Sequence, residues 1–265
     1  MKLSTLYAAN LLAAATLAGC GSDAKSTVDA SQTVDAAISI DAKPITIDSP
    51  PAVACTVPST VPAMITISGA GRQVNGFSIG NSAGVLVEAF RDNATTPEAT
   101  TTTATDGKYS ITFTTNGVAV NGTLRGTKAT FLDSYLYPGN AIYADIGSAP
   151  VLMLKQADID LISQLAGASP LAKGTNFVGV AVMDCAGNGL AGATITTTPA
   201  VKIRYNGANG LPSSAGTATS ADGVAFLFDV PAGDIAITAT VNGLAYPART
   251  VKVIANTTAA TILTP

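Results

Sequence analysis

The chain has 265 residues, a formal net charge of −3 and only 12% charged residues, which is enough length for one large domain or two ordinary ones. It contains no histidine and no tryptophan. The lack of histidine excludes the commonest general base, the commonest metal ligand and the usual partner of a nucleophilic serine or cysteine. Frequent glycine and proline, with long threonine runs, favour short strands and many turns. No basic face is visible in the sequence, which argues against nucleic acid as a partner.

Residues 1–19 have the features of a secretion signal. Lys2 supplies the positive start, and an apolar run that is too short to span a membrane stably leads to Leu17-Ala18-Gly19-Cys20. These four residues resemble the signal of bacterial lipoproteins, which implies that Cys20 is the acylated first residue of the mature chain. Gly21, in place of Asp, implies outer-membrane sorting in a Gram-negative bacterium by the same resemblance. The alternative is an ordinary signal peptide with a chance cysteine.

Residues 20–52 are expected to be a disordered tether. Asp-Ala recurs every six residues, starting at Asp23, Asp29, Asp35 and Asp41, and the segment offers little apolar surface to bury. The tether would hold the body away from the membrane. A short edge strand is the other interpretation.

The first globular domain is predicted over residues 53–168. Residues 64–68, 84–90, 123–132 and 151–154 have the alternation or the β-branched content of strands, and residues 69–84 are rich in turn formers. Asp106-Gly107 predicts a hairpin between residues 100–105 and 108–114. Residues 155–166 form the one convincing helix, with Gly167 suited to its C-terminal end. We expect this helix to pack at the domain junction; a role in binding is the other interpretation.

The second domain is predicted over residues 172–265. Residues 177–183, 190–198, 234–241, 250–255 and 261–263 are expected to be strands, and residues 202–214 a long loop. Asp222-Gly223 and Asn242-Gly243 each predict a hairpin, and Pro231-Ala232-Gly233 predicts a turn. Residues 224–230 are apolar on both faces, as in the core strand of a sandwich.

The order of these turns is specific. Leu190-Ala191-Gly192-Ala193, then Thr219-x-x-Asp222-Gly223, then Val230-Pro231-Ala232-Gly233 resembles the carboxypeptidase regulatory-like domain, a transthyretin-like β-sandwich. The first domain matches in part, through residues 84–90 and 105–113. The resemblance implies an all-β chain of two tandem transthyretin/Ig-like sandwiches. It also implies a non-catalytic role in display, spacing or binding.

Two cysteines remain in the body, Cys55 and Cys185. An exported protein meets an oxidising compartment, where two leftover thiols can pair. We expect a bridge that fastens the two domains together; the alternative is two separate thiols too far apart to bond.

Asp133–Tyr143 contains the aromatic cluster of the chain and offers the best candidate ligand surface. The residues of this surface are Asp133, Tyr135, Tyr137, Asn140, Tyr143 and Asp145. Aromatic platforms with planar polar groups suit a glycan, whereas the alternative is that the tyrosines pack a loop against the sandwich. No catalytic residues, metal ligands or cofactors are expected, and Asp106 and Asp222 are interpreted as turn residues.

The sequence thus predicts a lipid-anchored cell-envelope protein with a structural, display or adhesion role. A carbohydrate-binding module and an accessory subunit of a separate envelope enzyme are the alternatives. The expected partners are the membrane, through the lipid, and a glycan or another envelope protein.

Overall fold

The computed structural model describes residues 54–265 except 57, 77, 93, 169–170, 173–174 and 208–209. The signal, Cys20 and the tether therefore lie outside the described residues. The described part is all-β, with α2 (Gln156–Leu165) as its one α-helix. Below, the first unit means β1–β8 and the second unit means β9–β17.

The first unit precedes the helix. Its strands are β1 (Met64–Asn75), β2 (Ser78–Asn81), β3 (Leu86–Arg91), β4 (Ala99–Thr102), β5 (Lys108–Thr114), β6 (Gly122–Thr127), β7 (Asp133–Tyr137) and β8 (Val151–Met153). The second unit follows the helix. Its strands are β9 (Asn176–Val182), β10 (Thr194–Thr198), β11 (Lys202–Asn206), β12 (Pro212–Ser213), β13 (Val224–Val230), β14 (Gly233–Val241), β15 (Leu244–Ala245), β16 (Arg249–Val253) and β17 (Thr257–Leu263).

Six strands of each unit have the same pairing. In the first, β1 is antiparallel to β5 and parallel to β8, and β6 lies between β3 and β7. In the second, β9 is antiparallel to β13 and parallel to β17, and β14 lies between β10 and β16. Each unit is therefore a sandwich of two sheets with the same core topology, to which different strands are added: β2 pairs with β1 in the first unit, whereas β11 pairs with β13 in the second.

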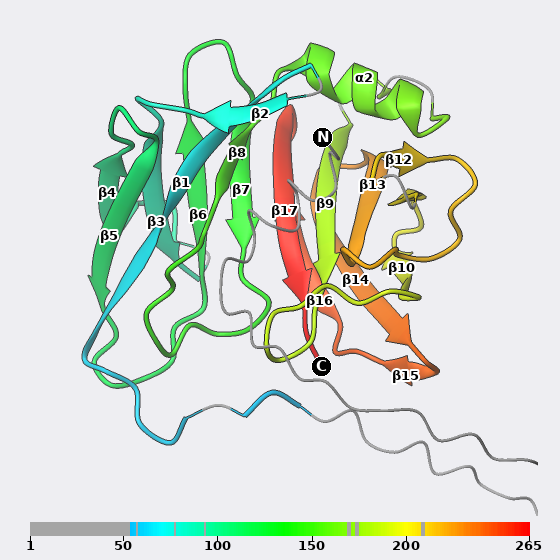
Figure 1. Ribbon diagram of the computed structural model, residues 1–265. Coiled ribbons are helices and arrows are strands. Elements are labelled where there is room, and N and C mark those ends of the chain that lie inside the picture. The colour runs from blue at the N-terminus through cyan, green and yellow to red at the C-terminus, as the bar shows by residue number, and fades with distance from the viewer. Residues whose placement is uncertain are drawn as a thin grey trace, which may run out of the picture.

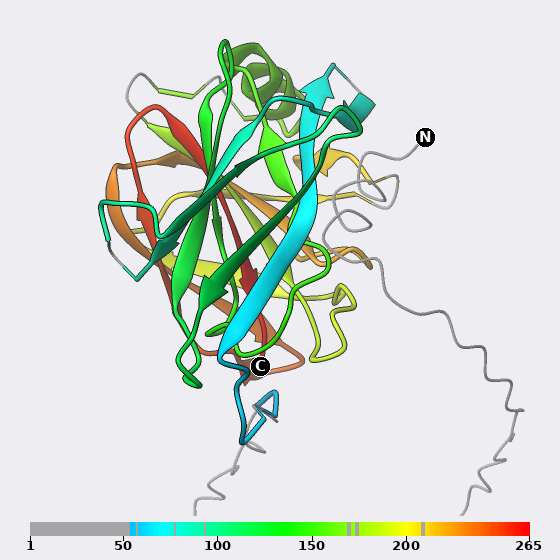
Figure 2. The same cartoon turned by 90° about the vertical axis from the view of Figure 1, so that its left-hand side faces the viewer.

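One sheet runs through both units. Strand β7 pairs in parallel with β17, and this pairing joins four strands of the first unit to five of the second in the order β12-β11-β13-β9-β17-β7-β6-β3-β4. Figure 1 shows β7, β17 and β9 side by side at the centre of the body. Each unit also has a smaller sheet, one of β2, β1, β5 and β8 and the other of β10, β14, β15 and β16. Figure 2 looks onto the first of these, with β1 running along the body.

The two smaller sheets cover opposite faces of the shared sheet. Along β7, Leu136 packs against the core of the first unit, whereas Tyr135 and Tyr137 pack against the core of the second. Because successive side chains of a strand point to opposite faces, the two cores must lie on opposite sides of this strand.

Helix α2 covers the part of the shared sheet that the small sheets leave open. Ile159 and Ile162 of the helix pack with Phe177, Phe226 and Phe228 in a third apolar cluster, separate from the cores of the two sandwiches. Gly167 follows the helix with φ +60°, and the amide of Ala168 donates to the Ser163 carbonyl at 2.8 Å, which closes the helix end. The predicted helix is confirmed, and it packs between the units, where Figure 1 shows it along one end of the body.

The prediction of a hairpin at each of the two Asp-Gly turns is wrong. Strand β4 pairs with β3 in the shared sheet, whereas β5 pairs with β1 in the small sheet. Likewise, the residues before Asp222 bond to the start of β10, whereas β13 lies in the shared sheet. Each Asp-Gly turn therefore carries the chain from one sheet of a sandwich to the other. The aspartates do act as turn residues, since Asp106 and Asp222 each accept a hydrogen bond from the amide two positions later at 3.0 Å.

Two segments predicted as turn or loop contain strands. Residues 69–84 hold the second half of β1 and all of β2, and residues 202–214 hold β11 and β12. In β1, Gly69 and Gly71 break the apolar alternation because the neighbouring backbone leaves no room for a side chain; a Cβ on Gly69 would lie 2.1 Å from the Ala149 carbonyl oxygen. The Asn242-Gly243 hairpin is confirmed by the pairing of β14 with β15.

Candidate functional site

The first unit carries a hollow on each face of its part of the shared sheet. One is an apolar cavity inside the sandwich, and the other is an open groove on the opposite face. They share the strand ends around Phe90 and Thr123.

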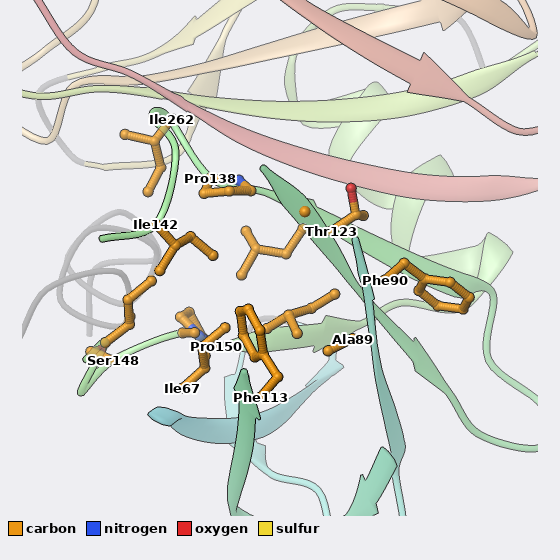
Figure 3. Close-up of a pocket in the computed structure, with 15 residues that line it drawn as sticks. Ile67, Ala89, Phe90, Phe113, Thr123, Pro138, Ile142, Ser148, Pro150 and Ile262 are labelled. Carbon is orange, nitrogen blue, oxygen red and sulfur yellow. The ribbon is translucent and has the colours of Figure 1, made fainter. Parts of the chain in front are cut away.

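The apolar cavity has a volume of about 70 Å³ and lies beneath the segment of residues 138–150. Figure 3 shows Ile67, Phe113, Pro138 and Ile142 around it, with the ring of Phe90 turned away. The polar side chains of this lining are limited to the hydroxyls of Thr123 and Ser148, which give few groups that could orient a sugar or a peptide. The cavity is best understood as a gap in the packing of the core.

The groove measures about 240 Å³ and lies at the junction of the two units. Its floor is the outer face of β3, β6 and β7, and its wall is the end of β16. Its lining residues are Phe90, Asp92, Ala94, Thr95, Thr123, Arg125, Tyr135, Tyr137, Lys252 and Ile254. It thus combines three aromatic side chains with two cations and one carboxylate.

The register of the shared sheet places the polar floor of the groove in one row. Glu88 pairs with Arg125 across β3 and β6, and Arg125 pairs with Tyr135 across β6 and β7. All three side chains therefore project from one face.

Arg125 is held from two sides. Its guanidinium forms an ion pair with the buried Glu88 at 2.6 Å and lies over the Phe90 ring at 5.3 Å. Burial lowers the pKa of Arg125, but the interactions with Tyr135 and Glu88 outweigh it, so the pKa is raised. The guanidinium is consequently fixed in position and always charged.

The two tyrosines of β7 connect the groove to the second unit. The hydroxyl of Tyr137 donates to the Lys252 carbonyl oxygen at 2.6 Å. Burial, followed by the charges of Tyr135 and Asp234, raises the pKa of Tyr137 to about 12. The Lys252 side chain itself is exposed and takes part in none of the ion pairs among the residues that the structure describes.

The structure separates the six residues of the predicted ligand surface. Asp133, Tyr135 and Tyr137 alternate along β7 and share its outer face. Asn140, Tyr143 and Asp145 belong to the following segment, where Asn140 donates to the Thr264 hydroxyl at 2.7 Å and Asp145 accepts from the Thr66 amide at 2.7 Å. These two polar side chains tie down the segment that covers the apolar cavity.

Of the groove residues, sequence reasoning identified Tyr135 and Tyr137 and missed the others, among them Phe90, Arg125 and Lys252. The alternation within β6 gave a signal for Arg125, which lies between the buried Leu124 and Gly126. In β3 the buried residues Val87, Glu88 and Ala89 are consecutive, so alternation gave no such signal for Phe90. Nothing local to Lys252 indicates that β16 lies beside β7.

Cys55 and Cys185 form a disulfide with an S–S distance of 2.17 Å and a Cα–Cα distance of 5.3 Å. The amide of Cys55 also donates to the carbonyl oxygen of Pro265 at 3.3 Å. The start of the described body, its C-terminus and the first turn of the second unit therefore meet at one end.

No cluster of three or more histidine, cysteine, aspartate or glutamate side chains with metal-site geometry occurs in the part of the chain that the structure describes. No helix among the described residues has the length and apolar character needed to cross a bilayer.

No protein-family model and no curated protein matches the sequence. Among solved structures, the Bacillus anthracis TIE protein superimposes with a TM-score of 0.25 and 15% identity, over 75% of this chain and 33% of that one. The chain thus spans about a third of the length of that protein. The minor pilin GBS52 of Streptococcus agalactiae superimposes with a TM-score of 0.24 and 11% identity, over 76% of this chain and 95% of that one. The shaft pilin SpaA of Lactobacillus rhamnosus GG superimposes with a TM-score of 0.23 and 13% identity, over 78% of this chain and 98% of that one. Superpositions at this level do not establish a common fold.

Proposed function

We propose that the protein is a lipid-anchored component of the cell envelope with a non-catalytic structural, display or adhesion role. Its anchor would be the acylated Cys20, in the outer membrane of a Gram-negative bacterium. The sequence Leu17-Ala18-Gly19-Cys20 at the end of a short apolar run supports the anchor, and Gly21 supports the outer membrane. More than one acyl chain gives a lasting attachment where a single chain is marginal.

The observation that carries the proposed role is the fusion of the two units into one body. Tandem domains on a flexible linker move independently. Here β7 and β17 share a ladder, and the 55–185 disulfide links the start of the first unit to the second. A rigid body suits the display of a surface at a fixed distance from the membrane.

The position of the disulfide also gives the body a direction. The tether would enter at Cys55, beside Pro265, while Figure 1 shows α2, β2 and β12 at the opposite end from the C-terminus. The end with α2 would therefore point away from the membrane.

We also propose that the units are tandem carboxypeptidase regulatory-like domains over residues 53–168 and 172–265. Their common strand pairing supports this proposal, and so does a shared hydrogen-bond pattern at the two Thr-x-x-Asp-Gly sequences. In both units the threonine hydroxyl donates to a carbonyl before an Ala-Gly pair, at 2.7 Å in Thr103 and 2.6 Å in Thr219.

Fractionation of cells that express the wild type and Cys20→Ser tests the function. We expect the wild type in the outer-membrane fraction and the variant outside it, and protease added to intact cells then reports which side the body faces. A wild type that is found in the soluble fraction would contradict the proposal. Cys55→Ser is the matched control, because it removes a cysteine of the body and should leave the wild-type distribution unchanged.

A further inference from the structure

We propose that the groove between β3, β6, β7 and β16 binds a neutral oligosaccharide. This inference goes beyond the proposed function, because the groove would bind its ligand whether or not Cys20 is acylated. It rests on the lining of the groove, the fixed position of its central arginine and the balance of its charges.

The aromatic side chains give the groove surfaces on which sugar rings can pack. Phe90, Tyr135 and Tyr137 lie together in the lining and are each only half-buried. A sugar ring has apolar C–H faces and a polar rim, so it matches an aromatic ring that is bordered by hydrogen-bonding groups. The apolar cavity on the other face of the sheet offers only the hydroxyls of Thr123 and Ser148 for this purpose.

The polar groups around these rings are suited to hydroxyls. Arg125 and Lys252 donate hydrogen bonds, whereas Asp92 accepts them, and a sugar hydroxyl can do both. Arg125 is already held by Glu88 and Phe90, so binding would cost little side-chain entropy there.

The charges favour a neutral ligand over an anionic one. The ion pair with Glu88 neutralises Arg125, and the carboxylate of Asp92 offsets Lys252 within the same lining. A phosphate or uronate would meet the Asp92 carboxylate as well as the Lys252 cation in the groove, whereas an uncharged hydroxyl can pair with either.

Both units contribute to the groove. The floor comes from the first unit, but Lys252 and Ile254 come from the second, next to the point where β7 joins β17. The groove therefore exists only because the two sandwiches share a sheet.

Isothermal titration of the purified full chain, in a detergent without a sugar head group, tests the proposal. The probes are the hexasaccharides of β-1,4-glucose, β-1,4-xylose, α-1,4-glucose and β-1,4-N-acetylglucosamine, with hexagalacturonate as the anionic arm. We expect at least one neutral probe to bind with a dissociation constant below about 1 mM. Absence of heat with every neutral probe at millimolar concentration, or binding of hexagalacturonate alone, would overturn it.

Variants locate the binding. Tyr135→Ala should weaken the affinity for the neutral probe at least tenfold, and Lys252→Ala, at an exposed position, severalfold. Lys108→Ala is the matched control, because Lys108 is also an exposed lysine on a strand and lies outside the groove. If Tyr135→Ala does not fold, Lys252→Ala and Thr123→Val carry the test, and unchanged affinity in both would refute the groove as the site.

Discussion

The hydroxyls of Thr103 and Thr219 form hydrogen bonds with backbone groups at equivalent positions in the two units. The hydroxyl of each donates to a carbonyl and accepts from an amide three residues further along, that of Val85 or Ala193, at 2.9 Å. The Asp-Gly pair then follows, with Gly107 and Gly223 at positive φ. Side chains that replace backbone partners in this way fix the crossing between two sheets, where no ladder exists to do so.

Gly223→Ala should be much more destabilising than Gly243→Ala. Both glycines have positive φ, but a Cβ on Gly223 would lie 2.2 Å from the Val182 carbonyl oxygen, whereas nothing lies within 4 Å of one on Gly243. We expect a loss of about 1–2 kcal/mol for Gly243→Ala and roughly 3 kcal/mol or more for Gly223→Ala, measured by urea denaturation. Equal losses would show that the tight approach at Gly223 is not real.

Alkaline pH should destabilise the fold through Tyr137. Its pKa is raised to about 12 in the folded chain, above the ordinary value of 10, so the unfolded chain loses this proton first. Stability therefore falls as the pH rises from about 10 to 12, and below pH 10 this group has no effect. Tyr137→Phe should reduce the slope of stability against pH in this interval. An unchanged slope would contradict the assigned environment of the hydroxyl.

At the scale of elements, strands of the shared sheet serve different cores on their two faces. In β13, Ala225 and Leu227 enter the core of the second unit, whereas Phe226 and Phe228 pack beneath α2. A helix that closes such a face replaces the second sheet that the core would otherwise need.

Ile159→Ala should therefore destabilise the protein by about 2–5 kcal/mol, because the side chain is fully buried against the shared sheet. Leu161→Ala is the control on the same helix, since Leu161 is half-exposed, and we expect a loss below about 1 kcal/mol. Thermal unfolding followed by circular dichroism gives both values. Similar losses for the two variants would mean that α2 does not close the third cluster.

The sequence predicted local elements better than their partners. Residues 155–166 form a helix and Asn242-Gly243 a hairpin, because both depend on nearby residues. An Asp-Gly turn has the same local chemistry whether the next strand returns to its neighbour or crosses to the other sheet, so the pairing of β4 and β5 could not be inferred from it. For the same reason Tyr135 and Tyr137 were identified as a surface, but Lys252, which lies 115 residues after Tyr137, was not.

At the scale of the whole molecule, the ladder of β7 and β17 and the disulfide between Cys55 and Cys185 unite the two units. The disulfide closes a loop of 130 residues that contains the whole first unit.

Replacing both body cysteines, in Cys55→Ser/Cys185→Ser, should cost about 2–4 kcal/mol because the unfolded chain gains freedom. Unfolding by urea under one set of conditions, with and without the pair, measures this cost. The unfolded, non-reduced wild type should show no titratable body thiol, and two such thiols would contradict the bridge.

Attachment through Cys20 is the central claim, and the mass of the mature protein tests it most directly. Intact-mass spectrometry of the detergent-purified wild type should give a chain that begins at Cys20 and carries a diacylglyceryl group. A mature chain that begins elsewhere, or that begins at Cys20 without added lipid, would contradict the account.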